Sequence, residues 1–178
     1  GDVSLRPHQR EATALGLHAR QLGRSGFLLA DEVGVGKTYA ALNLALKTSA
    51  RNVLVVCPLG VCAVWRAALA RMGDGGKRFL VINYDRLHKL LDAPAAAADA
   101  RKAATVRRMT ARAGKPRVDF DLVIADEAHN LRNPATQRSR CVQRLAWRKD
   151  VFTVRLSATA GQNPLELSYL APLLAAAL

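Results

Sequence analysis

The stretch FLLADEVGVGKT, residues 27–38, decides the fold of this chain. Its first four residues are apolar and precede a loop that contains glycine, a pattern typical of a buried β-strand that ends in a turn. A helical pattern then covers residues 37–49. A strand, a glycine-rich loop and a helix in this order predict the first unit of an α/β domain.

The loop between this strand and this helix has the residue types that bind phosphate. Glycine lets backbone N–H groups approach phosphate oxygens, and the start of a helix adds the positive end of its dipole. Lys37 can neutralise the β and γ oxygens of a nucleotide, and Thr38 can ligate Mg²⁺. The general pattern begins with glycine where this chain has Asp31, so a glycine-rich turn with a chance lysine is the alternative. The predicted nucleotide-binding residues are Gly34, Val35, Gly36, Lys37 and Thr38.

Apolar runs and helical patterns alternate along the rest of the chain. This alternation predicts an α/β doubly wound domain with a mostly parallel central sheet and helices on both faces. We expect strands over residues 27–30, 53–57, 79–82, 122–125 and 151–154. We expect helices over residues 7–22, 37–49, 61–72, 84–91 and 135–147, with Gly23 ending the first of them.

Chain length and net charge indicate a single globular domain with a negatively charged partner. The chain has 178 residues, of which 50% are hydrophobic, and this size predicts one globular domain. Lysine and arginine number 27 against 14 acidic residues, which gives a net charge of +13. Such an excess favours a polyanionic partner, above all nucleic acid, over a surface that is merely solubilising. No apolar run approaches the roughly 20 residues that span a bilayer, so we expect an intracellular protein without a membrane segment.

The cysteines predict no disulfide framework and no zinc site. The three cysteines, Cys57, Cys62 and Cys141, are odd in number and lack the C-x-x-C spacing of metal ligands. They lie in apolar surroundings, so we expect reduced thiols in the core.

A second chemical motif is LVIADEAH, residues 122–129, in which four apolar residues end in two acids. Phosphoryl transfer to water needs one carboxylate to hold Mg²⁺ and another group to orient or deprotonate the water. Asp126 and Glu127 fit these roles, while a solvated turn or a charge pair at a helix N-terminus is the alternative. The phosphate-binding loop earlier in the chain favours the catalytic interpretation.

Residues 93–117 interrupt the alternation as an Ala-rich, basic insertion. This segment is predicted to be a surface helix or a partly ordered loop. It is interpreted either as a basic arm that contacts nucleic-acid phosphates or as a solvated charged face. Its candidate nucleic-acid contacts are Arg101, Lys102, Arg107, Arg108 and Arg112.

The ordered motifs DEVGVGKT, DEAH and LSAT resemble motifs I, II and III of superfamily-two helicases and translocases. Finer features are similar to the Swi/Snf-type branch, and the resemblance extends over residues 5–170. Two positions depart from that branch: Ala158-Thr159-Ala160 replaces Gly-Thr-Pro in motif III, and Ala68 replaces an acid. The Swi/Snf-like features are LRPHQ (5–9), Pro58, Trp65, NYD (83–85), NLRNP (130–134) and QNPLEL (162–167).

The resemblance implies a RecA-like P-loop NTPase fold that uses ATP and Mg²⁺. Gln9 is implied to read the adenine edge, since an amide donates and accepts at once. Lys37 and Thr38 are implied to hold phosphate and Mg²⁺, Asp126 to hold Mg²⁺ through water, and Glu127 to be the base. Without the family, Gln9 reads as a residue on a helix surface.

The resemblance also implies residues that link the nucleotide state to the DNA-binding face. These are His129, Ser157 and Thr159. From the residues alone, His129 is a side chain at a helix N-terminus, and Ser157 and Thr159 are caps at a strand end.

Family members work with two RecA-like lobes, and residues 1–178 are expected to form only the N-terminal one, as a fragment of a longer protein. The expected function is an ATP-binding motor lobe that moves along double-stranded DNA when joined to its second lobe. That lobe supplies arginine fingers worth about 10³ to 10⁵ in rate, so the isolated lobe is expected to be nearly inactive. A lobe of an RNA or single-strand DNA helicase and a non-catalytic scaffold are the alternatives. The presence of Lys37, Thr38, Asp126 and Glu127 together favours the motor.

Overall fold

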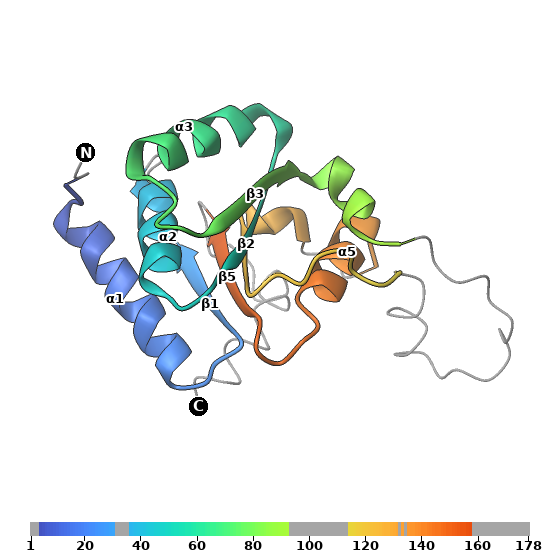
Figure 1. Ribbon diagram of the computed structural model, residues 1–178, viewed down its shortest axis with the longest axis horizontal. Coiled ribbons are helices and arrows are strands. Elements are labelled where there is room, and N and C mark those ends of the chain that lie inside the picture. Colours follow the sequence, from blue (N-terminus) through green and yellow to red (C-terminus); the bar gives the residue numbers. More distant parts are fainter. Residues whose placement is uncertain (1–3, 31–35, 93–113, 132, 134, 158–178) are drawn as a thin grey trace, which may run out of the picture.

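The computed structural model of this chain describes residues 4–30, 36–92, 114–131, 133 and 135–157 (Figure 1). In this part of the chain, a sheet with the strand order β1-β5-β4-β2-β3 forms the centre of the molecule, and all of its neighbouring strands are parallel. The predicted mostly parallel sheet is therefore confirmed. Its strands are β1 (Gly26–Ala30), β2 (Asn52–Cys57), β3 (Arg78–Asn83), β4 (Leu122–Ala125) and β5 (Phe152–Ser157).

Helical elements cover both faces of the sheet (Figure 1). Successive residues of a strand point to opposite faces, so Val53 and Val55 pack in one core cluster, and Leu54 and Val56 pack in the other. The first face is covered by α1 (Pro7–Gln21), α2 (Gly36–Lys47) and α3 (Cys62–Met72). The second is covered by the 3₁₀ helices η2 (Tyr84–Leu90) and η3 (Ala128–Leu131) and by α5 (Gln137–Leu145).

Helix α1 begins and ends where its sequence signals predict. Pro7 occupies the first turn, where its missing N–H has no intrahelical partner to lose. Gly23 follows the helix with φ of 72°, a left-handed conformation that glycine adopts without steric cost. Gly16 lets α1 approach α2 closely, because a Cβ atom there would lie 2.6 Å from Leu44 Cδ2.

Two helices differ from the prediction. Residues 84–90 form a 3₁₀ helix after Asn83, whose side chain accepts a hydrogen bond from Arg86 N at 2.9 Å. Helix α5 begins only at Gln137, because Thr136 is extended and caps the helix by accepting from Ser139 N. The short helix η1 (Leu59–Val61) precedes α3.

The two ends of the predicted insertion lie side by side, in an arrangement that we call the neck. Leu91 forms an antiparallel bridge with Pro116, and Arg117 Nε lies 3.2 Å from Asp92 Oδ1. The Arg117 N–H also donates to Leu90 O at 2.8 Å. The candidate nucleic-acid contacts Arg101, Lys102, Arg107, Arg108 and Arg112 lie outside the described residues.

None of the helices in the described ranges combines the length and the apolar character that crossing a bilayer requires.

Candidate functional site

The parallel sheet brings the candidate residues to one place. Because all strands are parallel, their carboxyl ends meet at the same end of the sheet, which is where open α/β sheets bind ligands. Asp126 and Glu127 follow β4 there, Tyr84 follows β3, and Ser157 ends β5. Helix α2, which carries Lys37 and Thr38, begins at Gly36 a short distance along the chain from the end of β1. Gly34, Val35 and Thr159 lie outside the described residues.

The first turn of α2 buries the two side chains that are predicted to bind phosphate and Mg²⁺. Lys37 is 9% exposed and Thr38 is 8% exposed. A lysine side chain is rarely buried to this extent on a protein surface. The predicted phosphate-binding lysine is therefore held inside the fold and is no solvated surface residue.

Gln9 ties α1 to the start of α2. Its Nε2 donates to Gly36 O at 3.2 Å, and its Oε1 accepts from Arg6 N at 2.8 Å. The side chain is only 7% exposed, so the alternative of a helix-surface residue is wrong. Its role in reading adenine stays a prediction.

A cavity of about 250 Å³ lies between α1, β1 and α2, beside these residues. Apolar walls from Leu15 and Leu28 face the polar groups of Gln9 and Lys37. Binding sites for small molecules commonly combine such apolar walls with a few polar groups.

Asp126 is the most tightly positioned of the candidate residues. Its Oδ2 accepts from Trp65 Nε1 at 2.8 Å, and its Oδ1 accepts from the Glu127 N–H at 2.8 Å. The Asp126 N–H donates to Val56 O at 2.8 Å, and Tyr84 Oη donates to Asp126 O at 2.6 Å. Both the carboxylate and the peptide of Asp126 are thus fixed by hydrogen bonds.

Trp65 and Tyr84 carry part of the family resemblance but were not among the predicted site residues. Burial first, and then the negative charge of Asp126, raise the pKa of the Tyr84 phenol above its usual range, so the phenol stays a donor. Large aromatic side chains with one polar atom usually find a partner for it when buried. The available signal was that Trp65 lies in the first helix after β2 and that Tyr84 directly follows β3.

Glu127 has a left-handed backbone, with φ of 49°, which is the one positive φ among the described non-glycine residues. This conformation costs a non-glycine residue about 1–2 kcal/mol. Its Oε2 lies 3.6 Å from Nε2 of His129, which belongs to η3. Ser157 is buried at the end of β5. The coupling roles predicted for His129 and Ser157 stay predictions.

Cys57 and Cys62 place their sulfur atoms 3.4 Å apart in the core beside the site. Burial, followed by the hydrogen bond to Cys62, raises the pKa of the Cys57 thiol far above its usual range. Burial also raises the pKa of Cys141. The three cysteines are free and buried, as predicted.

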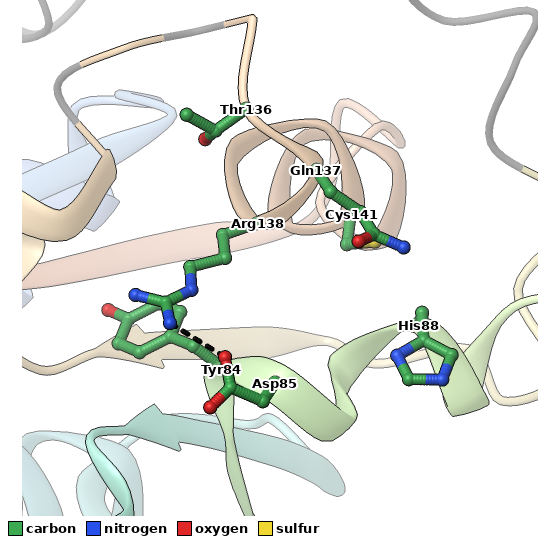
Figure 2. A pocket seen from close by; sticks show the side chains of 7 residues that line it. All are labelled: Tyr84, Asp85, His88, Thr136, Gln137, Arg138 and Cys141. Carbon is green, nitrogen blue, oxygen red and sulfur yellow. Dashed lines mark hydrogen bonds and ion pairs between the residues drawn. The ribbon is translucent and has the colours of Figure 1, made fainter.

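A second cavity, of about 360 Å³, lies between η2 and the start of α5 (Figure 2). Arg138 Nη2 contacts Asp85 Oδ1 at 2.6 Å, and its guanidinium carbon lies 5.9 Å from the centre of the Tyr84 ring. Tyr84 therefore contacts Arg138 with its ring and Asp126 with its hydroxyl. This cavity was not predicted from the sequence. Its other lining residues are His88, Thr136, Gln137 and Cys141.

The donor set at the carboxyl end of the sheet fits Mg²⁺. Asp126 offers a carboxylate and Thr38 a hydroxyl, and hard oxygen atoms are the ligands that Mg²⁺ prefers. These two residues are the ones that could hold the metal beside a nucleotide.

Comparison with known proteins gives the family. The family model described as "Type III restriction enzyme, res subunit" (ResIII) matches residues 2–162. The chain is 25% identical over 181 residues to the DNA repair and recombination protein RAD54B of Gallus gallus, covering 93% of this chain and 19% of that protein. It is 28% identical over 184 residues to Protein CHROMATIN REMODELING 25 of Arabidopsis thaliana, covering 91% of this chain and 20% of that protein.

A bacterial relative is the uncharacterized ATP-dependent helicase YqhH of Bacillus subtilis, 29% identical over 169 residues, which cover 90% of this chain and 27% of that protein. The chain thus spans between about a fifth and about a quarter of the length of these relatives. The family match, the parallel sheet and the relatives agree with the resemblance of the motifs to superfamily-two helicases and translocases. The chain belongs to the ResIII family and is a superfamily-two helicase-like lobe with a RecA-like α/β fold.

Proposed function

We propose that this chain is the ATP-binding motor lobe of a Swi/Snf-like, DNA-dependent ATPase. Joined to a second RecA-like lobe, it hydrolyses ATP with Mg²⁺ and moves along double-stranded DNA inside the cell. The observation that supports this proposal best is the fold position of three residues: the buried Lys37 and Thr38 begin the helix that follows β1, and the hydrogen-bonded Asp126 follows the parallel strand β4. The names of the relatives, a DNA repair protein and an ATP-dependent helicase, support it further.

The nucleotide contacts are assigned to α1 and to the start of α2. Gly34, Val35 and Gly36 offer backbone N–H groups to the phosphates, and Lys37 neutralises phosphate charge. The Gln9 amide reads the adenine edge in the adjoining cavity, where Leu15 and Leu28 offer apolar walls. Because Gln9 already contacts Gly36 O, the same residue connects base recognition with the phosphate-binding loop.

The hydrolytic roles are assigned to the residues after β4. Thr38 and Asp126 hold Mg²⁺, which, when bound, neutralises charge on the phosphates. Glu127 orients the attacking water and accepts its proton. This changes the charge of the carboxylate that the His129 imidazole contacts. His129, Ser157 and Thr159 pass the nucleotide state to the DNA-binding face.

The DNA contacts are assigned to the basic insertion, and a scaffold without catalysis is the competing function. The net charge of +13 supports binding to phosphates. A scaffold has no need of Lys37, Thr38, Asp126 and Glu127 together. The second lobe supplies arginine fingers, so this chain alone is expected to turn ATP over slowly.

Calorimetry with ATP and Mg²⁺ tests the nucleotide site. We expect a dissociation constant between micromolar and millimolar, about −8 to −4 kcal/mol, because one lobe supplies only half of the contacts. Lys37→Ala should remove detectable binding. Lys47→Ala is the matched control, since Lys47 is exposed in the last turn of the same helix and should change nothing. Equal affinity of wild type and Lys37→Ala would contradict the proposal.

Fluorescence anisotropy over a salt series tests the DNA contacts. Log K should fall with log salt at a slope of about −0.9 for each phosphate neutralised. Changing Arg107, Arg108 and Arg112 together to alanine should make that slope shallower. A control variant changes Arg10, Arg71 and Arg78 to alanine and so removes the same charge elsewhere. Its slope should stay closer to the wild-type slope. Binding to single strands that is far tighter than binding to duplex would favour the single-strand helicase.

A further inference from the structure

We infer that Trp65 is a positioning residue for Asp126: its indole N–H sets the orientation in which the carboxylate meets Mg²⁺. Tyr84 assists by fixing the peptide of the same aspartate. This inference rests on the proposed function, because it takes Asp126 to be a residue that holds Mg²⁺.

The Trp65 side chain has one polar atom, and that atom is directed at Asp126. The residue is 1% exposed, and Nε1 lies 2.8 Å from Asp126 Oδ2. An indole N–H only donates, and its bond to an ionised carboxylate is stronger than one between neutral groups. The two residues are 61 positions apart in the sequence, so the contact depends on how α3 packs on the sheet.

The hydrogen bonds leave room for a metal. Asp126 Oδ2 accepts from Trp65, and Oδ1 accepts from the Glu127 N–H. An ionised carboxylate has about four lone-pair sites. One donor on each oxygen therefore fixes the plane of the carboxylate and leaves lone pairs on both oxygens for a ligand.

The two aromatic donors reach Asp126 from opposite faces of the sheet. Trp65 belongs to the core cluster under α1, α2 and α3, and Tyr84 belongs to the cluster on the other face. Tyr84 Oη donates to Asp126 O at 2.6 Å, while the Arg138 guanidinium lies over its ring (Figure 2). A residue at the end of the sheet could have its hydrogen bonds met by water. Donors from both helical layers instead hold Asp126 in one position.

The expected consequence concerns the metal more than the nucleotide. Removing a group that orients a metal ligand typically weakens metal affinity about 10- to 100-fold. Trp65→Phe keeps a buried ring and removes the N–H donor. The variant should therefore need about tenfold more Mg²⁺ for half-maximal nucleotide binding.

The first experiment measures the contact itself in the metal-free chain. The chain has two tryptophans, and Trp147 is 61% exposed, which gives a matched control. In a ¹⁵N NMR spectrum, assigned with Trp147→Phe, the Trp65 indole proton should exchange slowly with solvent. Asp126→Ala should shift the Trp65 indole signal and speed its exchange, while Asp119→Ala, at an exposed aspartate, should leave it unchanged. If Asp126→Ala changes neither the position nor the exchange rate of the Trp65 indole signal, the inference is overturned.

The second experiment titrates Mg²⁺ against binding of a fluorescent ATP analogue by the intact chain. Trp65→Phe should raise the Mg²⁺ concentration at half-saturation and leave affinity in EDTA unchanged. Trp147→Phe should change neither quantity. Tyr84→Phe, on a different element, should shift the Mg²⁺ requirement in the same direction by a smaller factor.

The outcomes separate the inference from the proposed function. Wild-type chain that binds no nucleotide contradicts the proposed function and, with it, a role for Trp65 in metal binding. If wild type binds nucleotide with Mg²⁺ and Trp65→Phe needs the same Mg²⁺ concentration for half-saturation, the result contradicts only the inference. An equal loss of affinity with and without Mg²⁺ shows a purely structural tryptophan and also contradicts it.

Discussion

Strand β4 has an aspartate at each end: Asp121 precedes Leu122, and Asp126 follows Ala125. At the amino end of the sheet, Asp121 Oδ2 accepts two backbone N–H bonds, from Arg51 and Asn52, each at 2.9 Å. Its Oδ1 lies 3.6 Å from Arg148 Nη2. This aspartate connects the start of β2, the start of β4 and the residues before β5.

At the carboxyl end, Asp126 accepts one hydrogen bond on each oxygen, and one donor is the Trp65 side chain. Its neighbour along the chain is the acidic, backbone-strained Glu127. The same residue type on the same strand thus has two roles: Asp121 holds strands together, whereas Asp126 is itself held in place. The difference indicates that hydrogen-bonding pattern, more than burial, distinguishes a structural carboxylate from a candidate catalytic one.

The sharpest test of this comparison is Asp126→Asn. A bound metal contributes several kcal/mol to phosphoryl transfer. In the protein that joins this chain to its second lobe, losing the carboxylate charge should therefore lower the single-turnover rate of ATP hydrolysis with Mg²⁺ by about 100-fold or more. Asp121→Asn is the control and should leave that rate unchanged. Equal losses in both variants would break the distinction between the two ends.

The second test measures stability by urea unfolding, and here the larger effect is expected at Asp121. Asp121→Ala removes the acceptor of two backbone N–H groups, which should lower the free energy of unfolding by about 2 kcal/mol. Asp119→Ala is the control, because Asp119 is exposed and lies 3.7 Å from the same Arg148. A loss for Asp119→Ala that equals the loss for Asp121→Ala would assign the effect to Arg148 alone.

The third test asks whether the carboxyl end stores strain. Glu127→Gly relieves the left-handed backbone and should raise the free energy of unfolding by about 1 kcal/mol while abolishing hydrolysis. Glu127→Gln keeps the strain and removes the base, so it should lose hydrolysis at nearly unchanged stability. Stabilisation by Glu127→Gln as large as that by Glu127→Gly would show that charge repulsion, and not the backbone, is the cause.

The smallest expected effect is on the pH dependence of stability. Burial raises the pKa of the Asp121 carboxyl, but the N–H groups of Asn52 and Arg51 and the charges of Arg148 and Arg20 outweigh it and lower the pKa. A lowered folded-state pKa gives a stabilisation that is present above the unfolded pKa of about 3.9 and is lost as pH falls through the folded value.

Urea unfolding between about pH 2 and pH 7 measures this loss. The free energy of unfolding should fall less steeply with acid in Asp121→Asn than in wild type. Asp74→Asn, in an exposed turn, is the control and should follow the wild-type curve. Parallel curves for wild type and Asp121→Asn would contradict the expectation.

Most of the fold could be predicted from the sequence because its signals are local. Each strand is a short apolar run followed by a turn, and the sheet and both helical layers follow from their alternation with helical patterns. Element boundaries differed by a few residues, and the later start of α5 follows from the Thr136 cap. The helix after the Asn83 cap begins where predicted but is of the 3₁₀ type. Such caps depend on backbone geometry that composition does not specify.

The candidate site could be predicted only in part. Lys37, Asp126 and Glu127 carry their chemistry in residue type and spacing, and the parallel strands that precede them place them towards one end of the sheet. The contacts of Trp65 and Tyr84 with Asp126 join residues 61 and 42 positions apart. Contacts at such separations depend on the packing of helices on the sheet, for which the periodicity of a single segment gives no signal.

The neck formed by Leu91 and Pro116 makes this domain modular. The described residues on the two sides of the intervening peptide lie side by side, where Arg117 contacts Asp92. The entropy of closing a loop rises slowly with its length, by about 0.6 kcal/mol for each doubling. Evolution can therefore lengthen, shorten or exchange the intervening peptide while β3 and β4 keep their register. For the same reason, the neck is the place at which a protein engineer could graft a reporter domain onto this fold.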